Sequence, residues 1–307
     1  MKDDKKVLVL TGGLGNQLFQ LAAGLACTDP KNLVVDYNLG KPRLNRRGTP
    51  DIDSFSFPSQ ITFDTLTKRK LAFSKFGSLA FKVSSKKFQN SIAQYVWLWL
   101  KDRLGIFSVF LSDGVGFDPR LNSKVKHKWI FGPFHTYKYV ERDSIRRFIS
   151  AMAPREHPDW LRALEIAAVD EKPIVLHIRL SDYKNIQELG ILRETYFESS
   201  LKLAISHFPN SRIWLFTDEE ELAIKILGEI YSPEMRIINY DLSDSASNLE
   251  AMRFGHAYVL SNSTFSWWGA YLSKSPNPKV FCPDKWFKTK QNPLYMIPRE
   301  WEMVANS

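Results

Sequence analysis

The sequence predicts an α/β protein with two domains, each built on a parallel sheet covered by helices. Apolar runs with the length and β-branched character of buried strands alternate with helix-like segments from about residue 173 onward. These runs are 174–178, 213–216, 236–239, 257–260 and 280–282, and helices are expected near 193–207, 219–229 and 245–254. Such alternation is typical of a parallel sheet with helices on both faces.

The amino-terminal half begins with the same pattern. Val7–Leu10 predicts a strand, Gly12–Gln17 a turn and Leu18–Ala26 a helix, but the alternation is lost across about 45–125. We expect a first domain over 1–155 with a helical basic insertion at about 60–110, and a second domain over 156–307. The last ~20 residues either stay with the second domain or pack back on the first.

Composition indicates an ordinary globular protein. Of 307 residues, 44% are hydrophobic and 24% charged, which is enough apolar material for two cores. No apolar run approaches membrane-spanning length and the start does not resemble a signal peptide, so a cytoplasmic protein is expected. Cys27 and Cys282 lack CxxC spacing and are expected to be core thiols.

The net charge of +9 is concentrated in one segment. Residues 68–103 hold nine Lys or Arg and one acid, Asp102, which gives +8, and they also contain several Phe, Tyr and Trp. This mixture suits an anionic membrane surface, an acidic acceptor or single-stranded nucleic acid, although a helical subdomain with solvated lysines explains it equally well. We expect peripheral contact with the inner membrane and no nucleic-acid partner.

Polar residues gather where the predicted strands end, which is where parallel sheets bind ligands. His177 lies at the end of one strand, Arg179 and Asp182 follow in the loop beyond it, and Asp218 ends the next strand. A guanidinium binds phosphate through two hydrogen bonds and keeps its charge at any working pH, so Arg179 could neutralise a departing diphosphate. Asp218 could accept hydrogen bonds from a ribose or nucleobase, or simply begin a helix.

The segment 261–272, SNSTFSWWGAYL, places hydroxyl residues where a buried strand turns into a helix. Ser263 or Thr264 is expected to be the N-cap of that helix. Unpaired backbone N–H groups, the positive end of the helix dipole and neighbouring hydroxyls can hold a phosphate without a metal. An ordinary N-cap is the alternative.

The loop Gly12–Gln17 has the position of a nucleotide-binding turn without its full signature. It has no GKS or GKT, and Leu18 replaces the third glycine of the dinucleotide fingerprint. Its glycines permit close approach of a ligand, and Asn16 offers a donor and an acceptor, although a plain tight turn is also possible.

A metal site is not expected. Asp51-Ile52-Asp53 matches the DxD pattern formally, but no buried apolar strand precedes it, and no other His, Cys, Asp or Glu group has ligand spacing.

Three segments occur in order: GGLGNQ at 12–17, HIRLSDY at 177–183 and SNSTFSWWGAYL at 261–272. Together they resemble the bacterial α-1,2-fucosyltransferases of glycosyltransferase family eleven. The resemblance implies a GT-B fold, with two Rossmann-like domains facing across a cleft, GDP-L-fucose as the donor, inversion at the anomeric carbon and no metal requirement.

The resemblance also implies roles for individual residues. Arg179 would stabilise the leaving diphosphate, while His177 and Asp182 would shape the nucleotide pocket. The sequence does not identify the general base, for which the candidates are Asp182 and an acidic residue of the amino-terminal domain. Further donor-binding residues would come from the helix start and from the other domain, with Asp218 on the next strand: Ser263, Thr264, Phe265, Ser266, Gly15 and Asn16. Trp267 and Trp268 would be packing residues.

The expected reaction is transfer of L-fucose to the 2-hydroxyl of a β-galactoside, or a lipid-linked glycan, in bacterial surface-polysaccharide synthesis. The chain departs from the usual HxRRGDY motif at Leu180 and Ser181, and Asn248 stands where the family more often has Asp. The alternatives are another GDP-sugar, another fucosyl linkage, or an inactive scaffold that binds polyanions or membranes.

Overall fold

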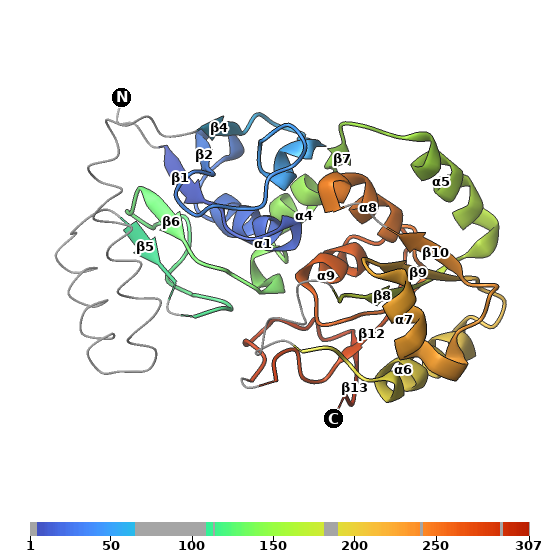
Figure 1. Ribbon diagram of the computed structural model, residues 1–307. Coiled ribbons are helices and arrows are strands. Elements are labelled where there is room, and N and C mark those ends of the chain that lie inside the picture. The colour runs from blue at the N-terminus through green and yellow to red at the C-terminus, as the bar shows by residue number, and fades with distance from the viewer. Residues whose placement is uncertain are drawn as a thin grey trace. The chain divides into compact units, whose positions relative to one another are not determined.

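The computed structural model describes residues 5–64, 109–112, 114–180, 190–239, 242–288 and 291–306. The chain divides into two compact units (Figure 1). Unit 1 comprises Met1–Arg43 and Phe57–Ala151, and unit 2 comprises Leu44–Ser56 and Met152–Ser307. Most of the predicted basic insertion, from residue 65 to 108, lies outside the described residues.

The described part of unit 1 contains a parallel sheet with the strand order β4-β2-β1-β6-β5. Its strands are β1 (Lys6–Val9), β2 (Leu33–Asp36), β4 (Thr62–Asp64), β5 (Val109–Leu111) and β6 (Trp129–Phe131). Its helical elements are α1 (Leu14–Leu25), η1 (Pro30–Asn32), η4 (Tyr137–Tyr139) and α4 (Asp143–Ser150). The chain runs from β1 to one side and later returns to the other, so the order reverses between β1 and β6.

The helix α1 begins four residues earlier than the sequence predicted. Gly13 is its extended N-cap, so Gly15 and Asn16 belong to its first turn and not to a turn that precedes the helix. Leu14, Leu18 and Leu21 explain the early start, because their spacing places all three on one helix face and all three are buried.

The described part of unit 2 holds a parallel sheet with the order β10-β9-β8-β11-β12-β13. Its strands are β8 (Ile174–Ile178), β9 (Ile213–Thr217), β10 (Arg236–Asn239), β11 (Ala257–Val259), β12 (Lys279–Pro283) and β13 (Glu302–Val304). Its helical elements are α5 (Asp159–Glu171), α6 (Glu194–His207), α7 (Glu220–Leu227), η6 (Gly228–Ile230), η7 (Leu242–Asp244), α8 (Ser245–Met252) and α9 (Thr264–Tyr271). Here the order reverses between β8 and β11.

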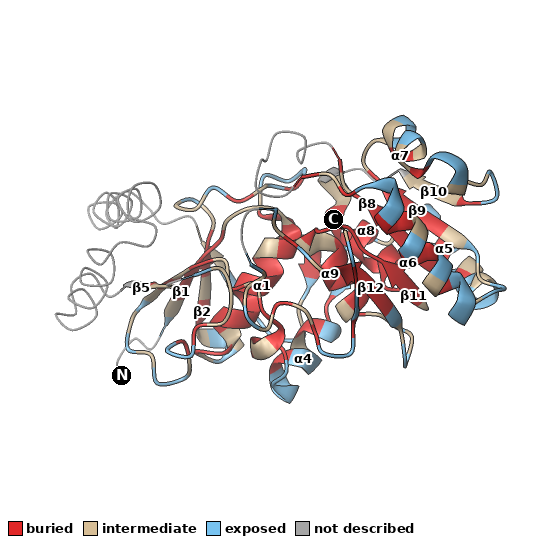
Figure 2. Cartoon of the chain, turned by 90° about the horizontal axis from the view of Figure 1, so that it is seen from below, coloured by how far each residue is buried: buried red, intermediate tan, exposed pale blue. Residues whose placement is uncertain are grey.

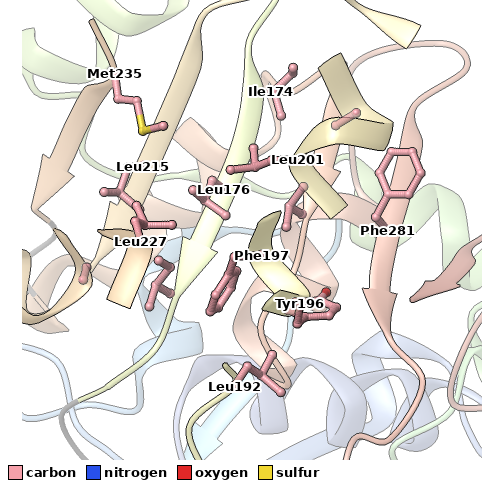
Figure 3. Close-up of a cluster of buried hydrophobic side chains, with 14 of the residues drawn as sticks. Ile174, Leu176, Leu192, Tyr196, Phe197, Leu201, Leu215, Leu227, Met235 and Phe281 are labelled. Carbon is pink, nitrogen blue, oxygen red and sulfur yellow. The ribbon is translucent and has the colours of Figure 1, made fainter. Parts of the chain in front are cut away.

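The unit 2 sheet is covered on both faces. Ile174, Leu176 and Ile178 point to one face, where they join side chains of α6 and α7 in a single apolar cluster (Figure 3). Val175 and His177 alternate with them and therefore point to the opposite face. Burial on both faces explains why these strands are continuous apolar runs, and Figure 2 shows them as buried.

The segment Leu44–Ser56 leaves unit 1 between β2 and β4 and packs with unit 2, whereas the sequence placed it in the first domain. It contains η2 (Asp51–Ser54) and β3 (Phe55–Ser56), and β3 pairs antiparallel with β7 (Ala153–Pro154). Arg155 Nη2 lies 3.0 Å from Asp53 Oδ1. At the carboxyl end, β13 pairs with β12, and the Trp301 ring lies 5.4 Å from that of Trp267.

Both cysteines are free and buried, as expected. Burial raises the pKa of Cys27 and of Cys282 to about 12, so both are thiols at neutral pH. Among the described helices, none combines the length and apolar character needed to cross a bilayer.

Candidate active site

The candidate active site lies at the carboxyl edge of the unit 2 sheet, where the strand order reverses. The strands β8 and β11 are parallel neighbours, with Leu176 opposite Val259. The chain leaves them towards α6 and α9, and ligands of such sheets commonly bind at the point where the strand order reverses. His177 lies within β8 near its end, Arg179 follows in the next loop, and α9 begins after β11 with Ser263 as its N-cap.

His177 joins the two strand ends. Its Nδ1 lies 2.7 Å from the Oγ of Ser261, and its ring centroid is 6.3 Å from that of Phe265. The side chain is fully buried. Burial, reinforced by the positive charge of Arg179 and opposed by Asp218, lowers the pKa of His177 to about 3, so the imidazole is neutral at physiological pH.

Arg179 is held in place by Asp218, which follows β9. The Arg179 Nη1 lies 3.0 Å from Asp218 Oδ2, and the two side chains are only 10% and 3% exposed. The other oxygen, Oδ1, accepts the backbone N–H of Leu180 at 2.9 Å. Both oxygens of Asp218 are therefore engaged within unit 2, which fits a residue that orients Arg179 better than one that binds a base or ribose.

The helix α9 begins where the sequence predicted. Ser263 is the N-cap, and its hydroxyl accepts the N–H of Phe265 at 3.3 Å. Ser266 Oγ donates to the Ser263 carbonyl at 3.2 Å, so both serine hydroxyls stabilise the helix start. Thr264 and Phe265 are partly exposed at this turn, and the backbone dipoles direct positive potential towards it.

Buried aromatic residues fix this turn in place. Trp267 and Trp268 are fully buried, and Trp267 Nε1 donates to the Met296 carbonyl at 2.9 Å. The hydroxyl of Tyr196, on α6, donates to the carbonyl of Leu260 at 2.6 Å. The two tryptophans are therefore core residues of unit 2, as expected.

The segment from Gly12 to Asn16 in unit 1 has features that permit a ligand to approach its backbone closely. Gly12 adopts φ +66°, a conformation that favours glycine. The N-cap Gly13 gives α1 no side-chain cap, and the guanidinium of Arg43 lies beside its Cα, where a Cβ would come 3.2 Å from the Arg43 Cζ. Asn16 Oδ1 lies 3.1 Å from His135 Nε2.

The structure thus gathers His177, Arg179, Asp218 and residues 263–266 at one sheet edge of unit 2, and places Gly15 and Asn16 at the helix start of unit 1. Asp182 lies outside the described residues. Sequence reasoning missed Ser261 and His135 as partners of His177 and Asn16. Ser261 stood inside a recognised motif, but nothing local to the sequence pairs His135 with Asn16.

No grouping of three or more His, Cys, Asp or Glu side chains suited to a metal occurs within the described ranges. Asp51 is buried in η2 and Asp53 pairs with Arg155, so the DxD pattern has a structural explanation.

Two bacterial glycosyltransferases match nearly the whole chain. An α-1,2-colitosyltransferase from Escherichia coli is 24% identical over 96% of this chain and 97% of its own length. The O-antigen biosynthesis glycosyltransferase WbnK, also from Escherichia coli, is 26% identical over 91% of this chain and 93% of its own. No protein-family model matches the chain.

Solved structures of a fucosyltransferase share the fold. NodZ from Bradyrhizobium, in its selenomethionine form, superposes with a TM-score of 0.52 and 11% identity over 92% of this chain and 95% of its own. NodZ α-1,6-fucosyltransferase co-crystallised with GDP also gives 0.52, over 92% and 96%. The chain therefore has the GT-B fold, and its relatives are glycosyltransferases.

Proposed function

We propose that this protein is an inverting α-1,2-glycosyltransferase that moves a 6-deoxy-L-sugar from its GDP donor to a glycan acceptor in O-antigen synthesis. L-fucose is the first candidate sugar, and the 2-hydroxyl of a β-galactoside is the candidate acceptor. The single observation that carries the proposal is the buried Arg179–Asp218 pair beside the α9 helix start at the unit 2 switch point. The motif resemblance to family eleven and the names of the two relatives support it.

Arg179 supplies the fixed positive charge that the reaction needs. As the bond between the sugar and the diphosphate breaks, negative charge grows on the departing oxygen, and a preoriented guanidinium stabilises that charge more in the transition state than in the ground state. Asp218 keeps the guanidinium in place before substrate binds. The positive end of α9 contributes in the same direction, through Thr264 and its neighbours.

Neutral His177 has a different role. A charged imidazole beside Arg179 would be repelled by it, and burial prevents protonation near neutral pH. The neutral ring and Ser261 thus fix the ends of β8 and β11 without adding charge. Phe265 offers a partly exposed ring for a nucleobase, and the motif resemblance assigns donor-binding roles to Gly15 and Asn16 of unit 1 as well.

The acceptor hydroxyl requires a general base. Asp182, three residues after Arg179, is our candidate. We propose no metal in this chemistry, because the Arg179 guanidinium and the positive end of α9 would stabilise the charge on the departing diphosphate.

Colitose, the 3-deoxy form of L-fucose, is the second candidate sugar. The α-1,2-colitosyltransferase that matches 96% of this chain favours this sugar. The linkage in its name is the same α-1,2 linkage that we propose for L-fucose. A donor pocket that accepts both would not depend on the 3-hydroxyl.

The test compares sugar donors in parallel incubations. The purified protein is incubated with GDP-L-fucose, GDP-colitose and GDP-mannose, each with a panel of β-galactosides, with and without chelator. We expect GDP release and an α-1,2-linked product from one or both of the first two donors, unaffected by chelator. Absence of GDP release from every donor, or a product with another linkage, would contradict the proposal.

A further inference from the structure

A second histidine lies at the switch point of unit 1. Asn16 sits in the first turn of α1 after β1, and His135 follows β6, which is the parallel neighbour of β1. The two residues are 119 positions apart, yet His135 Nε2 lies 3.1 Å from Asn16 Oδ1. This bond joins the start of α1 to the segment after β6, at the point where the strand order of unit 1 reverses.

The proton on this imidazole has a defined position. Burial lowers the pKa of His135 to about 4, so the ring is neutral at physiological pH and carries one N–H. An amide oxygen can only accept, so the proton resides on Nε2 and is donated to Asn16. The other nitrogen, Nδ1, is buried without a hydrogen-bond partner in the described structure.

The contact fixes which end of the Asn16 amide faces His135. With Oδ1 held by the imidazole, the Nδ2 group is directed towards Gly12, where a Cβ would collide with it. Gly12 at φ +66° therefore leaves the space that this amide orientation requires. The ring of His135 is itself held by Phe19, whose centroid is 5.3 Å away.

We propose that His135 is a positioning residue that sets the orientation of the Asn16 amide for ligand binding. The inference rests on the proposed function in one respect, the donor-binding role of Asn16. His135 touches no reacting atom and acts only through Asn16. Because a small misplacement of a contacting group can cost up to about 100-fold in rate, losing this hydrogen bond is expected to be visible in turnover.

Two variants separate positioning from packing. His135→Gln keeps an N–H donor near the position of Nε2, whereas His135→Leu fills similar space without a donor. We expect His135→Leu to lower kcat/KM by about 10- to 100-fold while its melting temperature stays close to that of His135→Gln, which retains most activity. His127→Leu is the matched control, because this half-buried histidine precedes β6 at the other end of the strand.

Crystal structures of the wild type and His135→Leu test the same claim without activity. The expected result is a rotated or disordered Asn16 amide in His135→Leu and an unchanged one in His135→Gln. An unchanged Asn16 in His135→Leu would overturn the proposal, as would equal loss of activity and stability in both variants. If the wild type transfers no sugar, the proposed function fails, and these structures still decide the positioning claim.

Discussion

At the residue scale, the proposed function depends on one buried ion pair. Arg179 is 10% exposed and Asp218 is 3% exposed, so each charge is largely removed from water and relies on the other. Removing one partner of such a pair leaves an uncompensated buried charge, which costs more than the pair itself contributes. The pair therefore indicates a fixed guanidinium rather than a source of stability.

Asp218→Asn tests whether this carboxylate orients Arg179. The variant keeps an oxygen for the Leu180 N–H but loses the charge that faces Arg179. We expect kcat/KM to fall about 10- to 100-fold, with a loss of about 3–5 kcal/mol in the free energy of unfolding. The control is Asp143→Asn, whose 73% exposed carboxylate pairs with Arg146 and should change neither quantity. Wild-type kinetics in Asp218→Asn would show that Arg179 does not need this partner.

His177 should make the protein sensitive to acid. Its pKa is about 3 in the folded state and near the ordinary 6.5 when unfolded, so the unfolded chain binds more protons between these values. Stability is complete above about pH 6.5 and falls as the pH decreases, by at most about 1.4 kcal/mol per pH unit from this residue. The charged groups that face it are Arg179, which strengthens the effect, and Asp218, which weakens it.

The measurement is the melting temperature of wild type and His177→Gln between pH 7.5 and pH 5. The wild type should lose more stability on acidification than the variant, which has no imidazole to protonate. Parallel curves would mean that His177 is not shielded from protons as described.

At the element scale, the start of α9 is fixed by its neighbours. Tyr196 on α6 donates to the carbonyl of Leu260, the residue between β11 and the SNS turn. The amide of Asn262 donates to the Gly190 and Trp286 carbonyls at 3.4 and 3.2 Å. These bonds satisfy buried backbone groups at a point where the sheet provides no partner.

Tyr196→Phe should lower the free energy of unfolding by about 1–2 kcal/mol, because the Leu260 carbonyl loses its donor in a buried site. Chemical denaturation measures this directly. Ser206→Ala, on the same helix, removes an exposed hydroxyl bonded to the Leu203 carbonyl and should change stability by less than about 0.5 kcal/mol. Equal effects in the two variants would argue against a role for the Tyr196 bond.

Several helices and strands could be predicted from the sequence. The strand 174–178 matches β8, and the N-cap at Ser263 is confirmed, because continuous apolar runs and hydroxyl caps are local signals. The early start of α1 was missed, since glycines at 12, 13 and 15 obscured the leucine periodicity. The crossing of 44–56 into unit 2 depends on β3 pairing with β7, which no local pattern encodes.

At the scale of the whole molecule, the two units share one structural arrangement. Each has a parallel sheet whose order reverses once, and at each reversal a neutral histidine bonds to a polar residue that follows the neighbouring strand. His177 is fully buried and His135 is half-buried. His177 could be found from sequence because it lies beside Arg179 in a motif. His135 could not, because its partner is defined only by the pairing of β1 with β6.

The net charge of the chain bears on which surfaces the protein contacts. Residues 68–103 carry +8 of the net +9 and lie outside the described residues. Peripheral membrane contact stays a prediction, and flotation with anionic vesicles at low and high salt measures it. Salt-sensitive binding is expected, and absence of binding at low salt would contradict it.

In the proposed mechanism, Arg179 stabilises the departing diphosphate. The direct measurement is kcat/KM for the preferred GDP-sugar in Arg179→Ala, compared with Arg212→Ala, which removes a 43% exposed arginine that precedes β9 and pairs with Glu171. We expect a loss of at least about 100-fold in Arg179→Ala and almost none in Arg212→Ala, with both proteins folded. Near-normal turnover in a folded Arg179→Ala enzyme would contradict it.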